Sequence, residues 1–293
     1  MLERQKIILA LTDGEPNHRI SRLKLVKLCF LIAQEWRAPA SSCLYQFVPY
    51  LHGPFSFTLY HELDALIRDG ELNAEGDNNV VRAEKRPPVT LKPESREVVR
   101  DVLRRYNRAP ISRLVNDVYS GHTWFTLNSE QAERRAAQRP ETPCLVYAAG
   151  YEGTQVDGFL NRLLENGIHR IIDVRANPLS RKYGFYKQTL ARISGNVGIE
   201  YVHIPELGIP AAWRSELGAA VNYAAVFKRY EREILPAMSA QVAQVGRMVT
   251  EKPSVLICME ADPALCHRSR LAQAVSRLIG LPAQDLGMES CNG

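Results

Sequence analysis

The chain has 293 residues, enough for two domains of ordinary size. With 24% charged and 45% hydrophobic residues it has the composition of a globular protein, which excludes a disordered or fibrous chain. The net charge of +5 permits an anionic partner without requiring one, and no uninterrupted apolar run is long enough to span a membrane. The N-terminus shows no signal-peptide pattern and the six cysteines form no Cys-x-x-Cys pair, so we expect reduced thiols and a cytoplasmic protein.

The N-terminal half is predicted to be a small, mainly helical domain over residues 1–138. Apolar periodicity predicts helices over residues 3–12, 21–36, 55–69, 94–106 and 111–119. A strand is expected at 44–48, a turn at His52-Gly53-Pro54, and a hairpin between 72 and 81 around a polar tip. This order of elements suggests a winged-helix-like domain.

Three stretches of this half resemble the Panacea domain of SocA-like antitoxins. They are Leu23–Cys29, Tyr50–Phe55 together with Leu59–Leu63, and Tyr119–Trp124. The resemblance implies a regulatory or interaction module that binds a protein partner, and it does not imply catalysis. The same apolar residues could equally form the core of any small domain.

The pattern changes after a polar segment at residues 131–142, which predicts a linker. From 143 to 293 strands and helices alternate. We expect strands at 145–149, 168–174, 201–204 and 254–259, and helices from 154 to about 166, at 221–234, at 237–249 and at 266–279. Such alternation predicts a three-layer, Rossmann-like α/β domain with a parallel sheet.

Three loops of this domain should meet at the carboxyl edge of the sheet, where open α/β folds bind ligands. Their polar residues are Tyr151 and Glu152, then Asp173, Arg175 and Arg181, and finally Glu260, Cys266, His267 and Arg268. Glycines at 150 and 153 would let a ligand approach the backbone or would simply make the turn. Their spacing is not that of a dinucleotide-binding loop.

The arginines of these loops predict an anion-binding site. Arg175, Arg181 and Arg268, assisted by His267, could hold a phosphate through paired N–H donors, and the positive end of the helix at 266 would add to the field. Asp173 could instead form an ion pair with Arg175, because residues two apart on a strand point the same way. The expected partner is a nucleotide or another nucleic-acid anion.

Two carboxylates and one thiol are candidates for catalysis. Glu152 and Glu260 each follow a strand and could act as general acid or base, or could bind the arginines instead. Cys266 lies at a predicted helix start beside His267, which would lower the thiol pKa and favour a nucleophile. A cysteine-dependent transferase is therefore an alternative, as is a packed and inert Cys266.

The remaining cysteines do not predict a metal site. Cys258 lies inside an apolar strand and should be buried and inert. A zinc site made from Cys258, Cys266, His267 and Cys291 would lack the usual ligand spacing. We therefore expect no metal, and the sequence names no cofactor.

The C-terminal half resembles the domain-of-unknown-function 488 family over residues 143–290. The matching motifs are Tyr147–Tyr151, Asp173–Arg175, Asn177–Arg181, Gly184–Phe185, Ile199–His203, Glu206–Gly208, Leu256–Glu260 and Cys266–Arg268. The resemblance implies a Rossmann-like fold and a single site built from the Asp-x-Arg and Cys-His-Arg clusters. It names no substrate.

Two functions are compatible with these patterns. One is a protein that binds or processes a nucleotide or nucleic acid under the control of an antitoxin-like N-terminal domain. The other is a non-catalytic interaction protein of antitoxin type. If Glu152, Arg175, Glu260 and Arg268 face one crevice, the first is favoured, and if they pair internally, the second is favoured.

Overall fold

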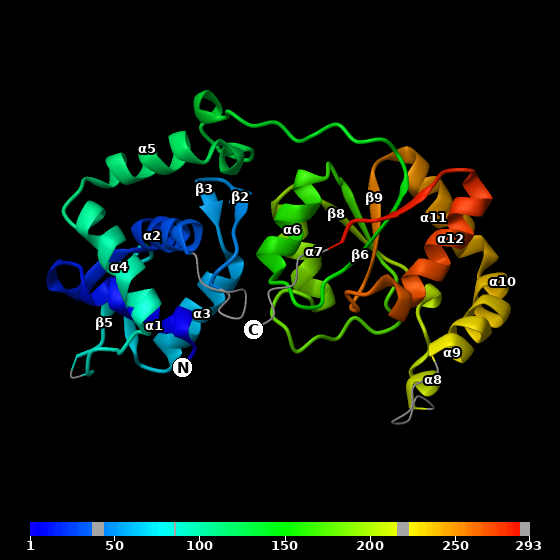
Figure 1. Ribbon diagram of the computed structural model, residues 1–293, viewed down its shortest axis with the longest axis horizontal. Helices are drawn as coiled ribbons and strands as arrows, with labels where there is room; N and C mark the ends of the chain where they lie inside the picture. The colour runs from blue at the N-terminus through cyan, green and yellow to red at the C-terminus, as the bar shows by residue number, and fades with distance from the viewer. Residues whose placement is uncertain (37–43, 85, 216–222, 288–293) are drawn as a thin grey trace. The chain divides into compact units, whose positions relative to one another are not determined.

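The computed structural model describes residues 1–36, 44–84, 86–215 and 223–287. The chain divides into two compact units, residues 1–138 and residues 139–290, which are described separately below (Figure 1). Among the described helices, none is both long enough and apolar enough to cross a bilayer.

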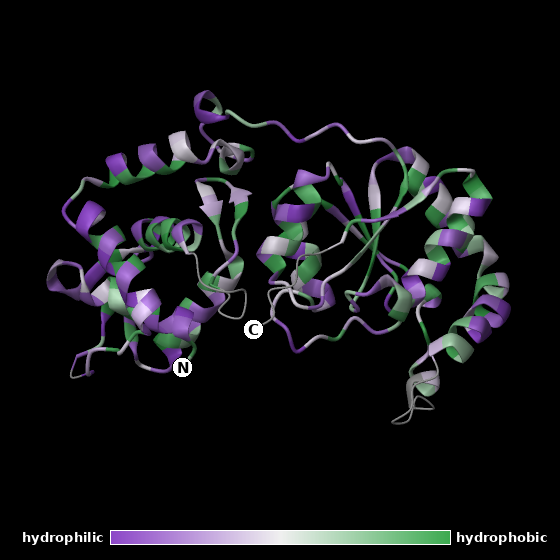
Figure 2. Cartoon of the chain, viewed as in Figure 1, coloured by the Kyte–Doolittle hydropathy of each residue, from purple (hydrophilic) through white to green (hydrophobic). Residues whose placement is uncertain are grey.

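The N-terminal unit is built around one central helix. Its helices are α1 (Glu3–Asp13), α2 (Arg22–Glu35), α3 (Phe57–Arg68), α4 (Pro93–Tyr106) and α5 (Ile111–Gly121). Every residue of α2 from Leu25 to Ile32 is buried, and the helix is apolar around most of its circumference (Figure 2). A helix with no polar face belongs in a core, so α1, α4 and α5 pack around α2. All five helices were predicted from the sequence.

Short strands complete this unit. Strands β1 (Arg19–Ser21), β5 (Asn79–Arg82) and β4 (Leu72–Glu75) form an antiparallel sheet in that order, which confirms the predicted hairpin. A second hairpin joins β2 (Val48–Tyr50) to β3 (Gly53–Phe55). The strand expected at 44–48 is wrong, because residues 44–47 are largely buried in the core without strand pairing. The winged-helix likeness stays a prediction.

The C-terminal unit contains a five-stranded, fully parallel sheet, as a Rossmann-like fold requires. Its strands are β6 (Val146–Gly150), β7 (Arg170–Asp173), β8 (Glu200–His203), β9 (Ser254–Cys258) and β10 (Ala283–Asp285), in the spatial order β10-β6-β9-β7-β8. Strand β9 lies in the middle, which explains its uninterrupted apolar run. Strand β10 was missed because its three residues are exposed and polar or small.

Helices cover both faces of this sheet. They are α6 (Val156–Glu165), α7 (Lys187–Asn196), α8 (Ala211–Ser215), α9 (Tyr223–Arg229), α10 (Leu235–Ala237), α11 (Ser239–Glu251) and α12 (His267–Ile279). Figure 1 shows α6 and α7 on one side of the sheet and α11 and α12 on the other. The latter pair forms a core with Val146, Ile172 and Leu256. Helix α7 was not predicted.

Three neighbouring strands deliver the predicted loops to one edge. Gly150 at the end of β6 is in register with Cys258 of β9, and Asp173 at the end of β7 is in register with Ile257. The loops after β6, β7 and β9 therefore leave the sheet side by side, as expected from the sequence.

Candidate functional site

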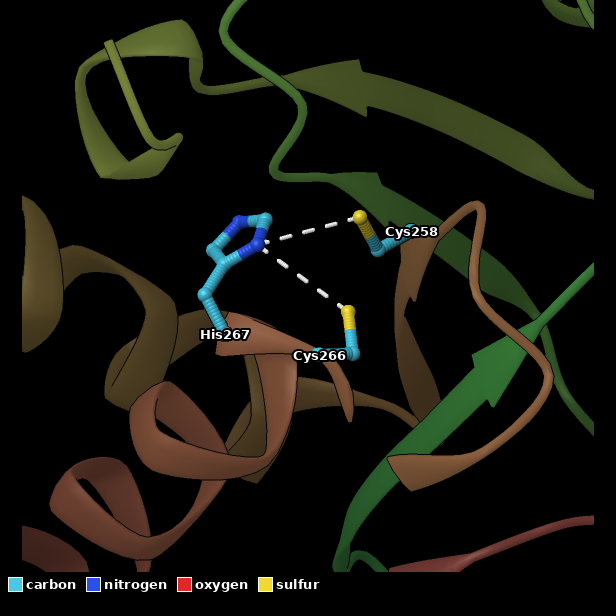
Figure 3. A group of neighbouring side chains, drawn as sticks. All are labelled: Cys258, Cys266 and His267. Carbon is cyan, nitrogen blue, oxygen red and sulfur yellow. Dashed lines mark hydrogen bonds between the residues drawn. The ribbon is translucent and has the colours of Figure 1, made fainter. Parts of the chain in front are cut away.

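Two cysteines and a histidine meet where β9 ends and α12 begins (Figure 3). Cys258 is the last residue of β9, Cys266 is the N-cap of α12, and His267 is its first residue. The two Sγ atoms and His267 Nδ1 all lie within 4.8 Å of one another, and no side chain of the three is more than 2% exposed. Nδ1 is 3.8 Å from Cys258 Sγ and 4.0 Å from Cys266 Sγ.

The orientation of the histidine follows from its other nitrogen. His267 Nε2 lies 3.2 Å from the carbonyl oxygen of Val174, the residue after β7. A carbonyl only accepts hydrogen bonds, so Nε2 carries the proton and Nδ1 presents its lone pair to the sulfurs. The ring also packs edge-on against Tyr230, at 5.5 Å between centroids. Metal-binding histidines are commonly held in this way by a backbone carbonyl.

Glu260 joins the two thiols. Its Oε2 accepts hydrogen bonds from Cys258 Sγ at 3.1 Å and from Cys266 Sγ at 3.0 Å. Burial acts to raise the pKa of Glu260, but the hydrogen bonds from Cys266 and Cys258, a backbone hydrogen bond and the neighbouring His267 together leave that pKa below its ordinary value. The carboxylate is therefore ionised beside both sulfurs.

The helix start does not produce the thiolate expected at Cys266. Burial first, and then the neighbouring thiol of Cys258, raise the pKa of Cys266 well above its ordinary value, although His267 acts in the opposite direction. A buried thiol loses more from desolvation than it gains from the helix dipole in this position. In the metal-free protein Cys266 is thus a neutral thiol.

Arg268 fixes the loop that carries Glu260. Its fully buried guanidinium donates to the carbonyl oxygens of Glu260 and Ala261, the latter at 3.1 Å, and to Asp285 Oδ2 at 3.0 Å on β10. These partners hold the chain between the two cysteines in one conformation. The expected anion-binding role of Arg268 therefore competes with internal hydrogen bonds.

The loop after β6 supports the same segment. A Cβ at Gly150 would lie 1.8 Å from the carbonyl oxygen of Glu260, so glycine is required because the Glu260 loop, and not a ligand, approaches it. Glu152 is exposed, and its Oε2 accepts a hydrogen bond from the backbone N–H of Ala261 at 3.1 Å. The carboxylates of Glu152 and Glu260 thus bind different groups.

Arg175 and Asp173 form the buried ion pair that the sequence left as an alternative. Arg175 Nε and Nη2 donate to Asp173 Oδ1 and Oδ2 at 2.8 and 2.5 Å. Its Nη1 donates to Tyr151 Oη at 2.7 Å and to the Phe185 carbonyl at 2.9 Å, and Tyr201 Oη donates to Asp173 at 2.6 Å. Of the three arginines predicted to hold an anion, Arg181 is the exposed one.

The structure therefore brings together Cys266, His267 and Glu260, and adds Cys258, for which the apolar strand predicts an inert thiol. The spacing of these residues along the chain predicts no zinc site, and the fold nevertheless places the ligand atoms of Cys258, Cys266 and His267 close together. Cys291 lies outside the described residues. The position of Cys258 at a strand end, two residues before Glu260, was the available clue.

Comparison with known proteins finds a similarity within this unit. No curated protein and no solved structure was found to match the chain, and the Panacea likeness of the N-terminal unit stays a prediction. Residues 155–275 match the model of a family described as domain of unknown function DUF488. The match spans β7, β8 and β9 and includes Asp173, Arg175 and the cluster from Cys258 to Arg268. The similarity of the chain to this family extends over residues 155–275.

Proposed function

We propose that the C-terminal unit binds a thiophilic divalent metal ion, with Zn²⁺ the first candidate, through Cys258, Cys266 and His267. The observation that carries this proposal is the buried group of two sulfurs and one imidazole nitrogen within 4.8 Å. Zinc–sulfur and zinc–nitrogen bonds of tetrahedral sites place neighbouring ligand atoms about 3.5 Å apart. The observed separations of 3.8 and 4.0 Å need only small side-chain rotations to reach this value.

Glu260 is the proposed fourth ligand. Its Oε2 lies 3.1 and 3.0 Å from the two sulfurs and accepts both thiol hydrogens. Metal binding requires the thiols to lose those hydrogens. The carboxylate oxygen then has no hydrogen bonds to accept from them and is free to coordinate the ion. Glu260 is not one of the three residues whose ligand atoms all lie within 4.8 Å of one another, so a Cys₂HisGlu set requires its carboxylate to move toward the ion.

We assign the ion a structural role. A closed, four-coordinate site without an open position is typical of structural zinc, and the three ligands from Cys258 to His267 are almost fully buried. The ion would join the end of β9 to the start of α12 and, through His267, to Val174 after β7. It would thereby rigidify the carboxyl edge of the sheet.

This role fits the non-catalytic alternative better than the enzymatic one. Arg175 and Arg268 bind internal groups, and Glu152 binds a backbone N–H, so these residues do not face one open crevice. Binding of a nucleotide or nucleic-acid anion is supported by one exposed guanidinium, that of Arg181. A transferase that uses Cys266 has no support, because burial raises the pKa of that thiol.

Metal analysis of the purified full chain tests the proposal. We expect one equivalent of zinc after reconstitution, and sulfur-to-metal charge-transfer absorption when Co²⁺ replaces it. Cys258→Ser and Cys266→Ser should each lose tight binding, and Glu260→Gln should weaken it. Cys144→Ser is the matched control, because that half-buried cysteine of the same unit lies outside the cluster.

Two results would refute a metal site. One is a wild-type chain that takes up no stoichiometric zinc from a metal-buffered solution. The other is equal uptake by the wild type and by the double variant Cys258→Ser/Cys266→Ser.

A further inference from the structure

The N-terminal unit contains a cavity of about 490 Å³ that the metal site does not explain. It lies between the first turns of α2 and the hairpin of β2 and β3, two elements that contact each other. Tyr60 of α3, Asn78 between β4 and β5, and Ile111 at the start of α5 also line it. Its volume is within the range of roughly 300–1,000 Å³ that small-molecule sites occupy.

The charge of the cavity is one-sided. Arg22, Lys27 and His52 are among the lining residues, and no aspartate or glutamate is. Lys27 is only 1% exposed, and its Nζ donates to the carbonyl oxygens of His52 and Pro54, the latter at 3.0 Å. Within the described residues no carboxylate lies at ion-pair distance from that Nζ. A buried ammonium without a counter-ion is costly, so an anion bound in the cavity would stabilise the protonated form of Lys27.

Arg22 strengthens this preference. Its Nη1 is 3.7 Å from Asp64, whose side chain is largely exposed, and its guanidinium lies 5.7 Å from the centre of the Tyr60 ring. Its Nε is buried and has no hydrogen-bond partner. Arg22 is also the first residue of α2, so the positive end of that helix lies at the same cavity.

Most of the remaining wall is aromatic or aliphatic, and Ser21 and Asn78 add two neutral polar side chains. The rings of Tyr50 and Phe55 are 5.1 Å apart, and those of Phe55 and Tyr60 are 4.6 Å apart. Leu23 and Ile111 also line the cavity, and they are 39% and 40% exposed. A ligand that complements these walls must combine one negative charge with an apolar body.

We infer that this cavity binds a small apolar carboxylate, with an aromatic or branched aliphatic body. The carboxylate faces Lys27 and Arg22 and supplies the counter-ion that the buried ammonium lacks. The apolar body lies against Tyr50, Phe55 and Tyr60. The N-terminal unit would then be a sensor of an organic acid, a function separate from metal binding by the C-terminal unit.

Calorimetric titration of the full chain with 3-phenylpropionate and indole-3-acetate tests this inference. Each acid should bind once and saturably. The corresponding neutral amides should bind at least about tenfold more weakly, because they lose a charged hydrogen bond. Acetate, which has the charge but no apolar body, should also bind far more weakly.

Variants separate this site from general charge effects. Arg22→Gln should weaken binding of the acids by about tenfold. Ile111→Glu, which places a negative charge on an exposed rim residue, should weaken it without affecting the fold. Arg19→Gln is the matched control, because Arg19 is exposed on β1 and pairs with Glu75 outside the cavity. Lys27→Met, which removes the buried amine, should also weaken binding of the acids.

Three outcomes would overturn the inference. The first is an absence of saturable binding for both acids. The second is equal binding of the acids and their amides, which would indicate an apolar pocket without charge selection. The third is an equal loss of affinity in Arg19→Gln and Arg22→Gln.

Discussion

Arg175→Ala should destabilise the C-terminal unit strongly, because the guanidinium is a buried structural group. The substitution removes the bidentate partner of Asp173 and two further donors, to Tyr151 and Phe185. Asp173 is fully buried and would keep hydrogen bonds only from Tyr201 Oη and from the backbone N–H of residue 175. Removal of one partner of a buried ion pair typically costs about 3–5 kcal/mol, against a total stability of about 5–15 kcal/mol.

Urea denaturation of the full chain measures this loss. Hydrogen exchange followed by mass spectrometry on peptides from β7 and β8 assigns the loss to the correct unit. Arg181→Ala, an exposed arginine of the same loop, should change the free energy of unfolding by less than about 0.5 kcal/mol. If Arg175→Ala is as stable as Arg181→Ala, the guanidinium is not structural, and a role in binding an anion would have to be reinstated.

Three further predictions concern the glycine, the buried lysine and the connection between the units. Gly150→Ala should lower both the free energy of unfolding and the zinc affinity, because the new Cβ would lie 1.8 Å from the Glu260 carbonyl oxygen. Competition with a chelator measures the zinc affinity, and an unchanged value would contradict this prediction. Burial lowers the pKa of Lys27 from 10.5 to about 7, so unfolding takes up a proton above that pH. The free energy of unfolding should therefore rise between pH 7 and 9, by at most about 1.4 kcal/mol per pH unit. Lys27→Met should lack this contribution, so it should appear when the pH curve of that variant is subtracted from the curve of the wild type. Trypsin should cut first after Arg134 or Arg135, where the irregular backbone begins, and mass spectrometry of early digests should show fragments that separate the two units.

Much of the fold followed from local patterns. The apolar periodicity of residues 23–32 and the alternation of strands and helices after residue 143 are properties of short segments, and helices and parallel strands formed where these patterns predicted. The edge at which the three loops meet also followed, since parallel strands end on the same side of a sheet. Strand β10 and helix α7 were not predicted, because their own residues show little apolar periodicity.

The site depended on contacts between distant residues. The sequence identified Glu260, Cys266 and His267 as a cluster, but it could not decide whether Asp173 or a ligand would bind Arg175. The chemistry of a guanidinium is the same in either case, and only the packed fold selects its partners.

The same reason separates what the sequence determined about the proposed metal site from what the tertiary structure decided. The residue types suited to a metal were present in the sequence, but spacing rules describe ligands on a compact loop. Here Cys258 ends a strand and Cys266 is the N-cap of the following helix, and the carbonyl of Val174, the residue after another strand, orients His267. Cys258 and Cys266 are eight residues apart in the sequence. The packing of the parallel strands and the helix that follows them, and not local chain geometry, fixes the distance between these proposed ligands.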